Sequence, residues 1–165
     1  MKDCVFEERN MLFFQKMRIA YATVRLTENI LKHSIFDANR MIRSFLREQN
    51  IHDFEEQKFG KDHKIFLDTH ILTFSRSIET KTSLYRAETR GDCRMWFGNA
   101  IFSFAEPEDL FMITSVEKKL YVINISKIDL ELCYQTSYPN QIKQLIKKIH
   151  LNKENNSLVS NKFYR

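Results

Sequence analysis

The chain has 165 residues, 26 Lys and Arg against 21 Asp and Glu, a net charge of +5 and 43% hydrophobic residues. This length allows a buried core, and 28% charged residues beside 14 Phe exclude a disordered chain. Only three Gly occur and neither GxxxxGKS/T nor GxGxxG is present, which excludes the glycine-rich phosphate loops of common nucleotide-binding enzymes.

The first 60 residues are predicted to form a helical hairpin. One stripe of apolar side chains recurs at helical spacing: Phe13, Met17, Tyr21, Val24 and Leu31. It predicts one long helix over residues 7–32, and a capping-box-like pair, Ser34 and Asp37, begins a second helix. The stripe is wider than a solvent-exposed helix needs. We therefore expect an appendage that supports a homodimer or contacts a partner protein.

Residues 61–152 are predicted to form a β-pseudobarrel domain closed by a helix. Runs rich in aromatic and β-branched residues predict its strands: 64–67, 70–74, 82–86, 94–97, 100–104, 110–116, 120–126 and 130–135. The clearest hairpin has Glu117-Lys118-Lys119 as its turn. Apolar residues at helical spacing over 142–149 predict the closing helix, and 153–165 is expected to be a flexible tail. The predicted fold class is α+β: a helical hairpin, a mostly antiparallel β-barrel-like domain and a C-terminal helix.

The cysteines and the N-terminus predict the compartment. Cys4, Cys93 and Cys133 are widely separated and have no CxxC spacing, so neither a disulfide framework nor a zinc site is predicted. Residues 1–8 carry acids where a signal peptide has its apolar run. No stretch approaches the roughly 18 apolar residues of a membrane span. We expect a cytoplasmic protein without membrane contact.

Two rows of basic residues fall on the predicted helices. Arg18, Arg25 and Lys32 are seven residues apart, and Arg40, Arg43 and Arg47 lie at i, i+3 and i+7. Rows of this kind are common on the solvated faces of helices in small proteins, and we favour that interpretation for both.

The segment from residue 76 to 94 points more directly to a partner. It holds five cations, four of them arginine, whose planar fork suits phosphate oxygens and guanine edges. Aromatic and hydroxyl side chains interleave with them and are able to stack on bases or contact phosphate. The predicted DNA-binding residues are Arg76, Lys81, Tyr85, Arg86, Thr89, Arg90, Arg94 and Trp96. An equal alternative is that Tyr85 and Trp96 fill the core while the arginines pair with Glu88 and Asp92.

The same stretch carries a family resemblance. Residues 83–98 run from a basic Ser-Leu-Tyr-Arg strand through a Gly-Asp turn to an Arg-hydrophobic-Trp strand, and Glu106-Pro107-Glu108-Asp109 and a hairpin follow. Over about residues 64–135 the chain resembles the DNA-recognition pseudobarrels of some type II restriction endonucleases and of a plant transcription-factor family. The resemblance implies a restriction or phage-defence module that grips the DNA major groove, with Arg86, Arg90 and Arg94 near the DNA.

Two other functions stay open. Asp68 followed by Glu79-Thr80-Lys81 has the order of a D...ExK nuclease site, in which two carboxylates hold Mg²⁺ and lysine activates water. Glu55 or Glu56 is a possible third acid, and Asp109 with Glu117-Lys118-Lys119 matches equally well. Without this site we expect a binding protein that is no enzyme and holds neither metal nor cofactor. The other alternative is a protein–protein adaptor or inhibitor for which the charge of +5 is incidental.

Overall fold

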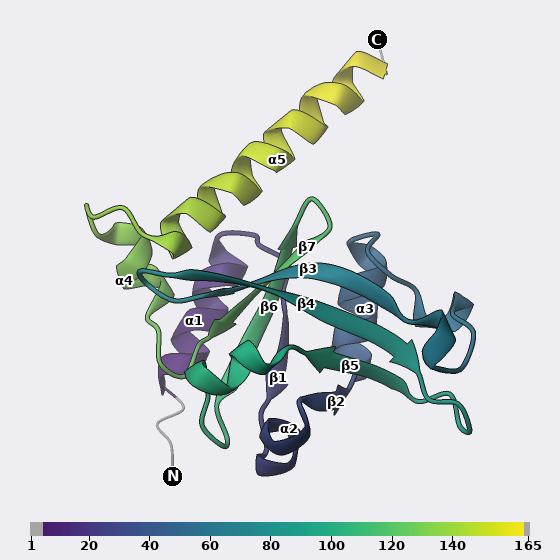
Figure 1. Ribbon diagram of the computed structural model, residues 1–165. Helices are drawn as coiled ribbons and strands as arrows, with labels where there is room; N and C mark the ends of the chain where they lie inside the picture. Colours follow the sequence, from purple (N-terminus) through teal and green to yellow (C-terminus); the bar gives the residue numbers. More distant parts are fainter. Residues whose placement is uncertain (1–4, 164–165) are drawn as a thin grey trace.

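A seven-stranded sheet curled into a half barrel organises the chain in the computed structural model, which describes residues 5–163 (Figure 1). Its order is β1-β6-β7-β3-β4-β5-β2. The strands are β1 (Ala22–Arg25), β2 (Ile35–Asp37), β3 (Ile65–Leu72), β4 (Ser77–Arg86), β5 (Cys93–Phe97), β6 (Leu110–Val116) and β7 (Lys119–Asn124). Neighbours pair antiparallel except β3 and β7, which pair parallel. The sheet is therefore mixed, where a mostly antiparallel one was predicted.

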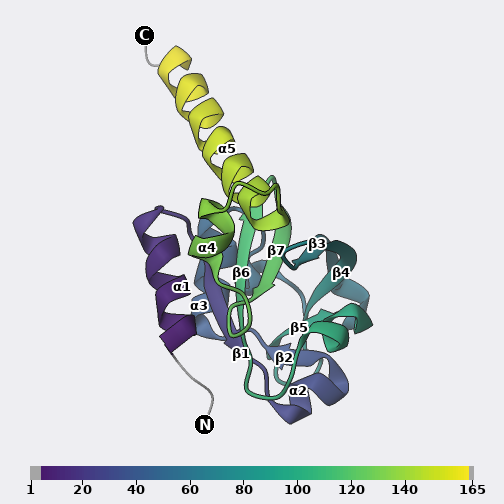
Figure 2. The same ribbon diagram turned by 90° about the vertical axis from the view of Figure 1, so that its left-hand side faces the viewer.

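Helices cover both faces of this sheet. They are α1 (Val5–Lys16), α2 (Glu28–His33), α3 (Arg40–Glu48), α4 (Leu130–Gln135) and α5 (Gln141–Phe163), with short 3-10 helices at Phe54–Glu56, Lys61–His63 and Asn99–Phe104. One core packs α3 against alternate residues of the strands, including Val24, Ile71 and Leu84. A second core packs α1, α4 and α5 against the opposite face, on Met112 and Ile123. We call these two faces the α3 face and the α5 face; Figure 2 shows α4 and α5 above β6 and β7.

The helix predicted over residues 7–32 is wrong beyond Lys16. Residues Ala22–Arg25 form β1, which pairs with β6, because alternation places Ala22 and Val24 in the core under the α3 face. Phe13 packs in the other core, so the apolar stripe that suggested one helix serves two cores. Both edge strands come from the first 60 residues, which are therefore part of the sheet rather than a helical hairpin beside it.

The start of the second predicted helix is also displaced. Ser34 ends α2 in the left-handed conformation instead of beginning a helix, and α3 begins at Arg40 behind the cap residue Asn39. The Asn39 side chain accepts a hydrogen bond from the backbone N–H of Ile42 at 2.9 Å. The buried face of α3 consists of Ile42, Phe45 and Leu46, and Met41 is exposed.

The predicted hairpin is confirmed as β6 and β7. Glu117 and Lys118 both have positive φ, as the type I′ turn of a two-residue hairpin requires. The predicted strand over 130–135 is wrong: these residues form α4, capped by Asp129 and buried through Leu130 and Cys133. Residues 100–104, also predicted as a strand, lie in a 3-10 helix. The runs 64–67 and 70–74 are largely one strand, β3.

The closing helix is confirmed and is longer than predicted. α5 continues to Phe163 and projects away from the sheet, so residues 153–163 are helical (Figure 1). Residues 164–165 lie outside the described residues, as do residues 1–4 with Asp3 and Cys4, whereas the acids Glu7 and Glu8 lie in α1. Cys93 and Cys133 are free thiols. Among residues 5–163, none of the helices combines the length and apolar character that crossing a lipid bilayer requires.

Candidate nucleic-acid interface

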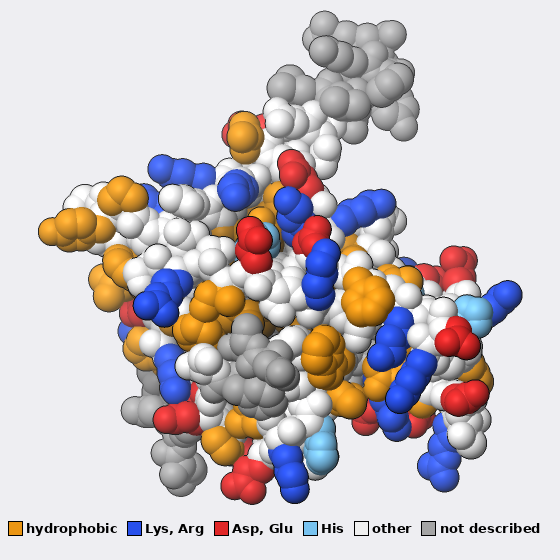
Figure 3. Space-filling model, viewed as in Figure 1, with side chains coloured by type: hydrophobic (Ala, Val, Ile, Leu, Met, Phe, Trp, Pro, Cys, Tyr) orange, Lys and Arg blue, Asp and Glu red, His pale blue; other side chains and the backbone are white. Residues whose placement is uncertain are grey.

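Most of the predicted DNA-binding residues lie on the β4–β5 hairpin. Lys81, Tyr85, Arg94 and Trp96 point to the α5 face, as the register of β4 with β5 dictates. The helices that cover this face over β6 and β7 do not extend over β4 and β5 (Figure 1). Figure 3 shows Lys and Arg side chains gathered toward the β4–β5 turn, with hydrophobic and acidic side chains among them.

The turn of this hairpin carries Thr89 and Arg90, both exposed. The predicted turn around Gly91 and Asp92 is confirmed, because these residues connect β4 to β5. Gly91 has a physical reason to be glycine. Its φ is +72°, and an added Cβ would lie 2.3 Å from the ring of Phe59. Phe59 thus holds the turn close to the body of the sheet, which presents Arg90 at its tip.

Arg86 is built into the base of the hairpin. Its Nε–H donates to the carbonyl of Gly91 at 2.7 Å, and its Nη1 donates to the carbonyl of Phe54 at 3.4 Å. The guanidinium also lies over the ring of Phe59, 4.4 Å from the centroid. These contacts fix the orientation of Arg86. Within the described part of the chain, its Nη2 makes no hydrogen bond or ion pair.

Of the remaining predicted residues, Tyr85 and Arg94 contact other side chains of the protein, and Arg76 lies far from the rest. Tyr85 is buried, with the ammonium of Lys64 over its ring at 4.8 Å. Arg94 is half-buried and lies 3.6 Å from Asp92 and 4.0 Å from Asp37. Arg76 lies in the β3–β4 turn, at the opposite end of the ten-residue strand β4 and ~30 Å from the other turn. The predicted set is therefore spread along the strand instead of forming one cluster.

The arginine row on α3 lines a hollow, whereas the sequence predicted only a solvated helix face. Arg40, Arg43 and Arg47 line one hollow of about 320 Å³ together with Arg86 of β4. The i, i+3, i+7 spacing signalled that the three share a helix face, but it could not show what that face meets. We name the arginines of α3 and of the hairpin the basic end: Arg40, Arg43, Arg47, Arg86, Arg90 and Arg94.

The structure brings the residues of the nuclease alternative together on the α5 face. Asp68 lies opposite Lys81, and Glu79 lies opposite His70. They line one hollow of about 420 Å³. Lys81 binds the Asp68 carboxylate by a hydrogen bond and an ion pair, which lowers the pKa of that carboxyl. Glu55 lines the arginine hollow instead, and no cluster of three His, Cys, Asp or Glu suited to a metal occurs within residues 5–163. The nuclease function stays a prediction.

The second D...ExK match does not form a site. Asp109 is fully buried at the start of β6, whereas Glu117 follows its last residue. The seven-residue strand separates the two carboxylates by ~23 Å. This separation is too long for two ligands of one metal ion.

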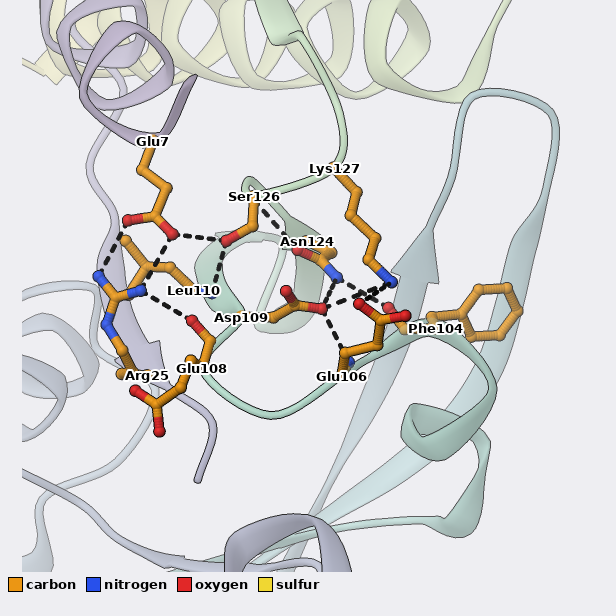
Figure 4. A network of polar contacts seen from close by, with 10 residues as sticks. All are labelled: Glu7, Arg25, Phe104, Glu106, Glu108, Asp109, Leu110, Asn124, Ser126 and Lys127. Carbon is orange, nitrogen blue, oxygen red and sulfur yellow. Dashed lines mark hydrogen bonds and ion pairs between the residues drawn. The ribbon is translucent and has the colours of Figure 1, made fainter. Parts of the chain in front are cut away.

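Asp109 instead belongs to a buried polar network that the sequence did not reveal (Figure 4). Its carboxylate accepts hydrogen bonds from the Asn124 amide at 2.9 Å and from the backbone N–H of Glu106 at 2.8 Å. The ammonium of Lys127 lies 3.7 Å away. These contacts tie the loop before β6 to the end of β7, so Asp109 of the 106–109 motif serves the fold.

In comparisons with known proteins, no family model and no curated protein matches the sequence, and no solved structure matches the fold.

Proposed function

We propose that this chain binds duplex DNA through the basic end. The proposal rests on one observation: two groups of arginines from separate parts of the sequence lie together in the fold. Three arginines from α3 and one from β4 line the same hollow, and Arg90 stands on the adjoining turn. Arginine is the residue best suited to phosphate oxygens and guanine edges.

The state of these side chains supports the proposal. Arg40, Arg43, Arg47 and Arg90 are exposed. Within the described part of the chain, none of these four side chains makes a hydrogen bond or an ion pair. Binding DNA would therefore not require breaking a contact inside the protein. The net charge of +5 adds a weak, long-range attraction to a polyanion.

The shapes of the two elements suggest different roles. A two-stranded β-ribbon fits the major groove of B-DNA, so the β4–β5 hairpin would bring Arg90 to base edges or to phosphates at the groove rim. The arginine row of α3 would contact the phosphate backbone, which fixes orientation without reading sequence. A restriction or phage-defence context, implied by the resemblance of residues 64–135, is part of the same proposal.

The experiment is a fluorescence anisotropy titration of a short labelled duplex with the double variant Arg43→Ala/Arg90→Ala. Both side chains are exposed, so we expect an intact fold and an affinity reduced by about tenfold or more, since each arginine loses charge-assisted contacts. The matched control is Lys147→Ala, an exposed cation on α5.

Unchanged affinity in the double variant would contradict the proposal. So would an equal loss in Lys147→Ala, because that result would mean that total charge, and not the basic end, determines binding.

A further inference from the structure

The hollow between α3 and the β4–β5 hairpin has the composition of an anion site. Its volume is about 320 Å³, at the lower end of the range for small-molecule sites. Arg40, Arg43 and Arg47 line it from one helix face, and Arg86 lines it from the facing strand. Buried apolar residues on the other side of α3, Ile42 and Leu46 among them, fix the helix against the sheet.

The four guanidinium groups differ in their contacts in a way that suits a ligand. Arg86 is held by its bonds to Gly91 and Phe54, so one wall of the hollow is rigid. The three α3 side chains are exposed, and over residues 5–163 they have no hydrogen-bond or ion-pair partner. A ligand in the hollow would therefore meet three arginine side chains without internal partners and one that is held in place.

The acids at the hollow do not neutralise these charges. Asp53 and Glu55 also line it, and the Asp53 carboxylate accepts the backbone N–H of Glu55 at 3.0 Å. Neither carboxylate lies within ion-pair distance of the arginines across the described residues. Four arginines minus two carboxylates leave a lining charge of +2. Like charges gathered in one hollow repel each other, and a dianion offsets that repulsion.

We propose that this hollow binds a phosphomonoester, and that the group is the terminal phosphate of a nucleic-acid strand. A phosphomonoester carries almost two negative charges near pH 7 and three acceptor oxygens. A backbone phosphodiester carries one charge, so the hollow prefers a strand end to the interior of a strand. The phosphate preference rests on the hollow, whereas the nucleic-acid source rests on the proposed function. A free nucleotide is the other source of the same group.

Inorganic phosphate is the direct probe of the hollow, with binding measured by titration calorimetry on the full chain. We expect Arg43→Ala and Arg47→Ala each to weaken binding by about tenfold, and Lys147→Ala to leave it unchanged. Thermal melting of each variant shows whether the fold is intact. Binding that is absent in the wild type, or equal in all three variants, overturns the inference.

A second arm identifies the source of the phosphate. One labelled strand is compared with and without a 5′-phosphate and with a 3′-phosphate, in duplex form, and AMP is tested as competitor. We expect a terminal phosphate to raise affinity by about tenfold and Arg43→Ala to abolish that gain. AMP binding as tightly as the phosphorylated duplex overturns the strand-end assignment.

The two arms separate this inference from the proposed function. DNA binding without any terminal-phosphate preference overturns the inference and leaves the proposed function standing. Inorganic phosphate binding that depends on Arg43 in a protein that binds no DNA supports the hollow and contradicts the proposed function.

Discussion

An ion pair between the buried carboxylate of Glu7 and the exposed residue Arg25 ties α1 to the edge strand β1. The Glu7 carboxylate is 4% exposed and accepts from both terminal nitrogens of Arg25, at 3.0 and 2.9 Å. The Ser126 hydroxyl donates to the same carboxylate at 2.6 Å (Figure 4). The hydrogen bonds from Arg25 outweigh desolvation and lower the pKa of Glu7 below its ordinary value of 4.5.

The lowered pKa of Glu7 makes the stability of the protein depend on pH. Because the folded pKa of Glu7 lies below the unfolded value, its contribution to stability is complete above about pH 5 and is lost as pH falls through the folded pKa. We expect Glu7→Gln to lower the free energy of unfolding by about 2 kcal/mol near neutral pH and by less at an acid pH below the folded pKa of Glu7. Urea denaturation at both pH values measures this, and an equal loss at both would show that the charge is unimportant.

At the scale of elements, α3 positions three of the six arginines in the basic end. The helix has nine residues, too few to be stable alone, so its cap and its buried face determine its place. The N-cap bond from Ile42 to Asn39 is the contact that variants can remove without touching the arginines.

We expect Asn39→Ala to cost about 1 kcal/mol, because the first turn of α3 loses its side-chain acceptor. For a chain of this size the loss lowers the melting temperature by about 2–4 °C. Asn39→Asp keeps an acceptor at the same position and should retain wild-type stability. If Asn39→Asp has the same lowered melting temperature as Asn39→Ala, the cap does not hold α3 in place.

Element length decided what the sequence could predict. The hairpin of β6 and β7 was predictable because two long β-favouring runs flank a short polar turn. β1 and α4 have four and six residues, too few for a periodic pattern to identify them. Their conformations are set by partners distant in the chain: β1 pairs with β6, and α4 packs on α1 and α5.

At the scale of the whole molecule, the arginines could be named from the sequence but their grouping could not. The chain folds α3 against the α3 face of the sheet, and that packing places residues 40–47 beside Arg86. The burial of Tyr85 under Lys64 likewise follows from the fold. The bond between Glu7 and Ser126 joins positions 119 residues apart, which no local pattern can indicate.

Duplex binding through the basic end should weaken steeply as the salt concentration rises. Contacts between arginine and phosphate release counterions, so the logarithm of the binding constant falls linearly with the logarithm of salt concentration, by about 0.9 per phosphate contact. We predict a slope of about −4 for the wild type and for Lys147→Ala, and a slope nearer −2 for Arg43→Ala/Arg90→Ala. A slope near zero, or one that the double variant leaves unchanged, would contradict DNA binding through the basic end.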